Sequence, residues 1–163
     1  MLIDYTSFDE VRAVLGVSPE ELEDETLVQP IYEYFLINDL EDIGSTLIDE
    51  YKTVKAIGFS SRTAAQRRLH DLTRLFAAVA VARQLLSSLP YFGEKRVQDG
   101  RAEKERIQDS FKNTKEGVEG QFGALRLRLS AAYVAIAGGT ALSRTTVTMM
   151  SSTGLATDPV TNT

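Results

Sequence analysis

Residues 75–86 read LFAAVAVARQLL, and this stretch decides the fold of the 163-residue chain. Alanine, valine and leucine cover most of the circumference of a helix built from it, so this helix must be buried on several sides. Its apolar positions recur at spacings of three and four from Leu69 through Leu72 and Phe76 to Val79, and Leu86 follows two helical turns later. We therefore predict a long central core helix that begins at Ser60 or Ser61 and stops before Pro90.

Shorter helices are predicted upstream of this core helix. Ser7 as N-cap and Gly16 as C-terminal stop bound a first helix. Ser18, Pro19 and Glu21 have the spacing of a capping box with proline at the first helical position, which predicts a second helix start there.

Pro30 predicts a break followed by a new helix that continues to Ile43 and ends at Gly44, because an interior proline removes a backbone donor. The apolar stripe of this region consists of Leu27, Ile31, Tyr34, Phe35 and Leu40. Ser45 or Thr46 is expected to cap another short helix that ends near Gly58.

The last predicted helix runs from about Asp99 to Ala137 and places its apolar residues close to a heptad seam. A helix of this length spans roughly 55 to 60 Å, so part of it should project from the domain or pack on a neighbouring subunit. Gly117, Gly120 and Gly123 follow one another at steps of three. They indicate a close helix approach, a bend or a helix break.

The sequence thus predicts an all-α fold: a helical bundle with two long helices over residues 1–138 and an extended C-terminal tail over residues 139–163. The tail is nearly uncharged and rich in threonine and serine, and helical periodicity stops at Gly138. Weak alternation over residues 145–150 would suit an extended segment on a partner. The alternative is a chain end without a role.

Charge is distributed very unevenly along the chain. Residues 1–50 hold fourteen acidic side chains against Arg12 alone, a net charge of −13, and residues 51–163 hold nine acidic against seventeen basic ones, a net charge of +8, in agreement with the overall −5. Such polarity allows copies to associate through unlike faces, or acidic and basic helices to pair within one subunit.

The residues offer little for catalysis or for binding a cofactor or metal. Cysteine is absent, His70 is the only histidine, and no phosphate-binding glycine loop or calcium-type acidic loop occurs. We predict no catalytic, cofactor-binding or metal-ligating residue, and a structural or surface role for His70. No segment reaches the roughly 20 apolar residues of a membrane span, and the N-terminus lacks a signal-peptide pattern, which predicts synthesis in a cytoplasm.

Basic residues raise the question of nucleic acid. Arginines cluster on the core helix, at Arg62, Arg67, Arg68 and Arg74. The next basic group is interleaved with acids and the whole chain is acidic, which argues against sequence-specific DNA reading. We expect these arginines to pair with the acidic first third, in the same or a neighbouring subunit.

Residues 8–22, FDEVRAVLGVSPEEL, followed by Thr26-Leu27 and a helix with Pro30, Tyr32 and Glu33, resemble the head-tail connector (adaptor or head-completion) proteins of tailed bacteriophages. The order of elements is also similar: short helices, a long alanine-rich helix, a second long helix and an extended C-terminal segment. The alternative reading is a cytoplasmic helical regulatory or binding module that acts as a monomer or dimer.

The resemblance implies a virion structural protein, made in the host cytoplasm, that forms a ring, usually twelve-fold, beneath the portal protein. Such a ring extends the DNA channel without specific DNA binding and docks the stopper or tail-completion protein. In this family the C-terminal segment commonly grips the portal, which makes the tail residues portal-binding candidates: Leu142, Arg144, Val147, Met149, Met150 and Leu155. Subunit contacts are expected from unlike charges: Glu20, Glu21, Glu23 and Asp24 against Arg62, Arg67, Arg68 and Arg74.

Overall fold

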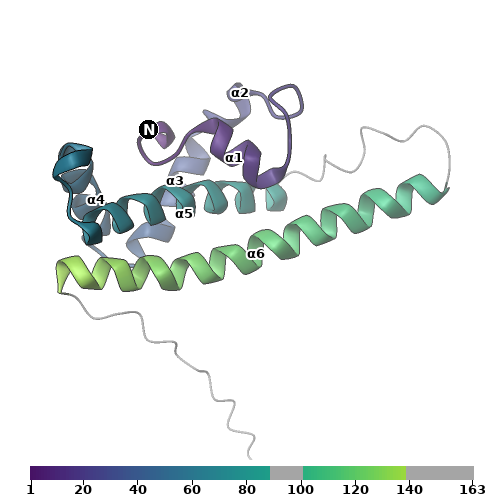
Figure 1. The fold of residues 1–163 in the computed structure, drawn as a ribbon. Helices are drawn as coiled ribbons and strands as arrows, with labels where there is room; N and C mark the ends of the chain where they lie inside the picture. Colours follow the sequence, from purple (N-terminus) through teal and green to yellow (C-terminus); the bar gives the residue numbers. More distant parts are fainter. Residues whose placement is uncertain (89–100, 139–163) are drawn as a thin grey trace, which may run out of the picture.

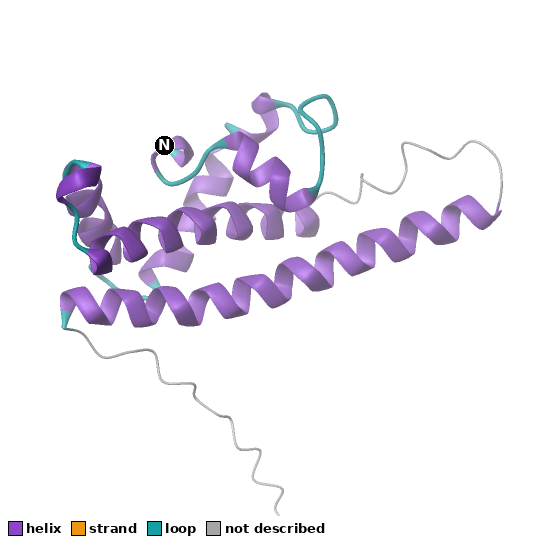
Figure 2. Cartoon of the chain, viewed as in Figure 1, coloured by secondary structure: helices purple, strands orange, loops and turns teal. Residues whose placement is uncertain are grey.

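The computed structural model describes the backbone of residues 1–88 and 101–138, with side chains for residues 1–87 and 112–138. Within these residues every regular element is a helix and none is a strand (Figure 2). The elements are η1 (Leu2–Asp4), α1 (Phe8–Leu15), α2 (Asp24–Leu27), α3 (Pro30–Glu41), α4 (Leu47–Ala56), η2 (Phe59–Ser61), α5 (Ala64–Ser88) and α6 (Arg101–Ala137). The all-helical class predicted from the sequence is confirmed for this part of the chain.

Helices α5 and α6 lie side by side and run in opposite directions (Figure 1). In this view α1 lies in front of α5 and α3 lies behind it. The 37 residues of α6 reach about 55 Å, and the beginning of α6 extends beyond the end of α5 (Figure 1). Because α1 and α3 lie in front of and behind α5, one side of the α5–α6 layer carries α1 and the opposite side carries α3.

The centre of the core lies between α5 and α6. The rings of Phe76 and Phe122 are 5.1 Å apart, and Leu69, Leu85 and Leu129 are fully buried around them. Each such side chain contributes about 1.5–3 kcal/mol through removal of apolar surface from water. The core position predicted for residues 75–86 is confirmed in general, although Leu75 remains exposed.

The start of α5 differs from the prediction. Residues 59–61 form the 3₁₀ turn η2, and α5 begins at Ala64. Thr63 Oγ1 accepts from the amide of Gln66, and the Gln66 side chain accepts from the amide of Thr63. This capping box satisfies two amide donors at the helix start, which explains why Thr63, and neither Ser60 nor Ser61, precedes the helix.

The predicted ends of α1 are confirmed. Ser7 Oγ accepts from the amide of Glu10, whose carboxylate accepts from the amide of Ser7. Gly16 has a φ of 68°, in the left-handed region that favours glycine at a helix end.

The helix predicted to start at Ser18 is wrong. The Glu21 carboxylate does accept from the amide of Ser18 at 2.9 Å, but these residues form only a turn, and α2 begins at Asp24. The carbonyl of Leu22 accepts from Nε of Arg12 at 2.9 Å, a contact that holds the chain in this turn. The same turn buries the Leu22 side chain.

Pro30 is the first residue of α3, as predicted, and Gly44 follows the helix at a close contact with α6. A β-carbon at Gly44 would lie within 3 Å of the Tyr133 ring, so only glycine fits there without movement of that ring. Thr46 precedes α4 but makes no capping hydrogen bond; its hydroxyl lies 2.7 Å from the Tyr133 hydroxyl. Its predicted capping role is therefore replaced by a contact between α4 and α6.

Helix α6 is continuous through Gly117, Gly120 and Gly123. These glycines neither break the helix nor admit a close neighbour from the described residues, because nothing lies within 4 Å of a β-carbon added at any of them. They remain exposed along one part of α6.

Candidate interaction surfaces

The six predicted portal-binding positions lie outside the described residues. They are Leu142, Arg144, Val147, Met149, Met150 and Leu155. The contact between this segment and a portal protein stays a prediction.

The predicted acidic contact residues, here called the acidic set, lie in the loop between α1 and α2 and at the start of α2. The acidic set is Glu20, Glu21, Glu23 and Asp24, and all four side chains are exposed. Asp24 is already paired within the chain, because its carboxylate accepts from Nη2 of Arg12. Glu21 is also engaged within the chain, because its carboxylate accepts from the amide of Ser18 at 2.9 Å.

Arg12 is the residue that holds this acidic loop in place. Its side chain is buried, with 8% of its surface exposed. Nε donates to the carbonyl of Leu22, and Nη1 donates to the carboxylate of Asp9 at 3.2 Å. Arg12, the single basic residue among residues 1–50, thus has a structural role that was not predicted from the sequence. The sequence feature that could have indicated this role is the isolation of Arg12 among acidic residues.

The predicted basic contact residues, here called the basic set, are Arg62, Arg67, Arg68 and Arg74. Arg62 donates to the carbonyls of Ile57 and Lys55 at 2.9 and 3.1 Å, and so joins the end of α4 to the start of α5. The guanidinium of Arg67 donates to the carbonyl of Arg62 and lies 5.4 Å from the centre of the Phe59 ring. Both arginines have local contacts, and Arg67 remains exposed.

Arg74 confirms that acidic and basic elements pair within one subunit. Its Nη2 lies 2.6 Å from Oε1 of Glu10, which joins α5 to α1. Burial raises the pKa of Glu10, but hydrogen bonds from Ser7 and Thr6 and the charge of Arg74 outweigh burial and hold this pKa below its ordinary value. A second pair of this kind joins Arg126 on α6 to Asp42 at 3.6 Å.

The acidic and basic sets do not meet within the subunit. The loop between α1 and α2 lies toward the C-terminal end of α5, whereas η2 and the first turns of α5 lie at its other end (Figure 1). Exposed acidic side chains therefore lie near one end of α5, and exposed arginines lie near the other.

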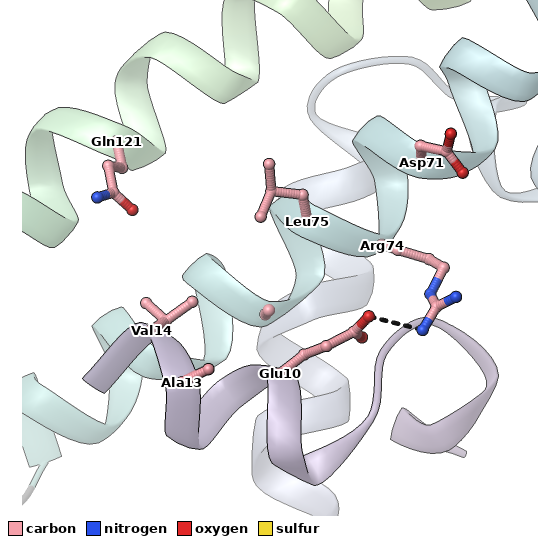
Figure 3. Close-up of a pocket in the computed structure, with 8 residues that line it drawn as sticks. Glu10, Ala13, Val14, Asp71, Arg74, Leu75 and Gln121 are labelled. Carbon is pink, nitrogen blue, oxygen red and sulfur yellow. Dashed lines mark hydrogen bonds and ion pairs between the residues drawn. The ribbon is translucent and has the colours of Figure 1, made fainter. Parts of the chain in front are cut away.

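Two hollows lie along the same side of α5. The first, the α1 groove, has a volume of about 490 Å³ (Figure 3). It is lined by Ala13, Val14, Asp71, Leu75, Ala78 and Gln121 and by the Glu10–Arg74 pair. The second, the alanine hollow, has a volume of about 250 Å³. It is lined by Ala64, Ala65, Arg68, Ala131, Ala132 and Ala135.

Helix α3 carries an exposed apolar surface that contradicts the predicted stripe. Leu27 and Leu40 are buried as expected, but Ile31, Tyr34 and Phe35 are exposed. The side of α3 that packs on the core carries Tyr32 and Leu36, which were not in the predicted stripe, together with Leu40. Because apolar residues occupy most of the circumference of α3, helical spacing alone could not decide which side would be buried.

His70 contacts the neighbouring side chains of Asp71 and Tyr51. His70 Nδ1 lies 3.0 Å from the Asp71 carboxylate, and its ring stacks on that of Tyr51 at 5.6 Å. Tyr51 stacks in turn on Tyr5, and its hydroxyl donates to the carbonyl of Asp4. In residues 1–88 and 101–138, no group of three or more histidine, aspartate or glutamate side chains is placed to hold a metal ion.

A search of the described helices found none long and apolar enough to cross a membrane. Comparison with protein-family models, with curated proteins and with solved structures gave no match to this chain.

Proposed function

We propose that this chain is a head-to-tail adaptor subunit of a tailed bacteriophage, a helical bundle whose two long helices and C-terminal tail serve assembly. Copies form a ring beneath the portal protein, extend the DNA channel and dock the stopper or tail-completion protein. The virion neck is the proposed location. The resemblance of residues 8–33 to head-tail connector proteins motivates this proposal.

The observation that carries the proposal is the separation of unlike surfaces on one subunit. The acidic loop before α2 and the arginines at the start of α5 lie at opposite ends of the subunit (Figure 1). Contacts between different surfaces of identical copies are heterologous, and they close into rings when the rotation between copies permits. A monomeric binding module has no need of this arrangement.

The projecting start of α6 gives further support. A helix that extends beyond its own core gains stability from a neighbour, because isolated helical turns are marginal in water. In a ring this neighbour would be the next subunit or the protein above or below it.

Deletion of residues 140–163 tests the portal contact. We expect the truncated protein to keep its helicity by circular dichroism and to lose binding to the portal ring in size-exclusion chromatography. A matched full-length variant with Met149→Ser and Met150→Ser should bind more weakly, whereas Thr161→Ser should bind normally. A truncated protein that still binds the portal ring as tightly as the full chain contradicts the assigned role of the tail.

A further inference from the structure

Helix α3 presents an apolar surface to solvent that a stable partner should cover. This α3 patch consists of Val28, Ile31, Tyr34 and Phe35, whose exposed fractions are 61%, 52%, 70% and 41%. The spacings of three and four from Ile31 to Tyr34 and Phe35 place these three side chains on one face of α3, and Val28 lies at the C-cap of α2, just before α3 begins. Neighbouring exposed apolar side chains on one helix face are typical of interaction sites on soluble proteins.

The charge beside the α3 patch restricts its partner. Helix α3 and its C-cap hold Glu33, Asp39, Glu41 and Asp42 and no basic residue. Glu41 and Asp42 lie one helical repeat beyond Tyr34 and Phe35, on the same exposed face. Two α3 patches placed face to face would bring acid against acid, which is unfavourable. The partner surface should therefore be apolar and basic.

The alanine hollow on the same chain has these properties. Its lining is formed by alanines from α5 and α6 with Arg68 at its side, and no acidic residue contributes to it. Arg128, also exposed, lies one turn before Ala132 on α6. At about 250 Å³ the hollow is smaller than the roughly 300–1,000 Å³ of small-molecule sites. It suits the side chains of a docked helix better than a free ligand.

The two surfaces face different ways on the subunit. Ala64 and Arg68 of the hollow continue the face of α5 on which Asp71, Leu75 and Ala78 line the α1 groove, at spacings of four and three. Figure 1 places α1 and α3 on opposite sides of α5. One copy therefore cannot cover its own α3 patch with its own hollow, but successive copies can.

From this geometry we infer that the α3 patch of one copy docks on the alanine hollow of the next, with Tyr34 and Phe35 over the alanines and Glu41 near Arg68 and Arg128. The contact is heterologous and repeats from copy to copy, which produces a ring or an open stack. This inference rests on the proposed function, because it assigns the contact that would hold the adaptor ring together.

Disulfide trapping tests the contact directly, because the chain has no cysteine of its own. Full-length Tyr34→Cys and Ala135→Cys proteins are mixed, oxidised and compared with each protein alone. We expect a cross-linked dimer in the mixture only, since a disulfide requires β-carbons within about 4 Å. Lys115→Cys, exposed elsewhere on α6, serves as the matched control with Tyr34→Cys. Cross-linking of Tyr34→Cys with itself, or no cross-linking in the mixture, overturns the contact.

Self-association measured by sedimentation supplies a second readout. Tyr34→Ala and Arg128→Glu should each weaken association by about tenfold or more while leaving the melting of the subunit unchanged. Tyr34→Phe should associate normally. Association unaffected by both disruptive variants overturns the inference.

The outcomes separate this inference from the proposed function. If the chain binds the portal ring but the Tyr34→Cys and Ala135→Cys proteins do not cross-link, the contact is wrong and the adaptor proposal stands. Specific cross-linking in a protein that does not bind the portal supports the contact and counts against the adaptor.

Discussion

Replacement of Gly44 by alanine tests how the turn after α3 packs against α6. The added β-carbon would lie 2.8 Å from Cζ and 2.9 Å from Cδ1 of Tyr133. Carbon atoms prefer separations of about 3.5–4.0 Å, so the ring must move by about 1 Å. Tyr133 is buried, and its hydroxyl lies 2.7 Å from that of Thr46. Overpacking costs about 1–3 kcal/mol and a lost hydrogen bond about 1 kcal/mol more, so we expect the free energy of unfolding to fall by about 2–4 kcal/mol.

Urea denaturation followed by circular dichroism, at low protein concentration, measures this change. In a separate thermal melt, the melting temperature should fall by about 5–15 °C, at about 2–4 °C per kcal/mol for a chain of this size. Gly120→Ala is the matched control, because nothing lies within 4 Å of its added β-carbon. Since Gly120 is inside α6, alanine there should raise stability by about 1 kcal/mol.

A double-mutant cycle identifies the cause. In a Tyr133→Ala background the ring is gone, and Gly44→Ala should then cost less than about 0.5 kcal/mol. A Gly44→Ala protein as stable as the parent, or an equal cost with and without the ring, would refute the reasoning.

Three further predictions concern buried or partly buried charge. Arg12→Ala should lower the free energy of unfolding by about 1–3 kcal/mol, because it leaves the carbonyl of Leu22 without its donor, and urea denaturation measures the loss. Glu10→Gln should destabilise the chain at neutral pH, because the folded-state pKa of Glu10 is lowered and its carboxylate therefore stabilises the fold above the unfolded-state pKa. The difference in stability between variant and parent should shrink as pH falls through the folded-state pKa. Asp39→Asn should do the opposite: burial raises the pKa of Asp39, so its ionised form costs stability at neutral pH, and the gain from asparagine should disappear below the unfolded-state pKa of about 3.8. Thermal melts across pH check both carboxylates, and parallel curves for variant and parent would count against either one.

Local signals in the sequence were sufficient where the partner residues are close along the chain. Ser7 with Glu10, Gly16 and Pro30 each act within one turn of the backbone, and the structure places them as predicted. Thr63 with Gln66 has the same local spacing and marks the start of α5, although the prediction placed that start at Ser60 or Ser61.

Contacts between distant segments could not be predicted in this way. The hydroxyl of Thr46 was expected to cap α4, but it meets Tyr133, 87 residues away. Ser18 and Glu21 do pair, yet the buried Leu22 and its bond to Arg12 turn the chain away from a helix. Each outcome depends on tertiary packing that overrides a local preference.

The interaction surfaces also differ in whether the sequence alone could predict them. The unlike charges of the acidic and basic sets were visible in the composition. The fold was required to show that the acidic loop lies toward one end of α5 and that Arg62, Arg67 and Arg68 lie at the other. The α3 patch was missed because helical spacing allows either side of so apolar a helix to be buried, and the chain buries Tyr32, Leu36 and Leu40.

Native mass spectrometry of the full chain, alone and mixed with the portal protein that the proposal assigns as its partner, tests the central claim most directly. The adaptor account predicts a closed oligomer of this chain bound to the portal ring, with a fixed number of copies per complex. A chain that stays monomeric and unbound in the presence of assembled portal rings would contradict it.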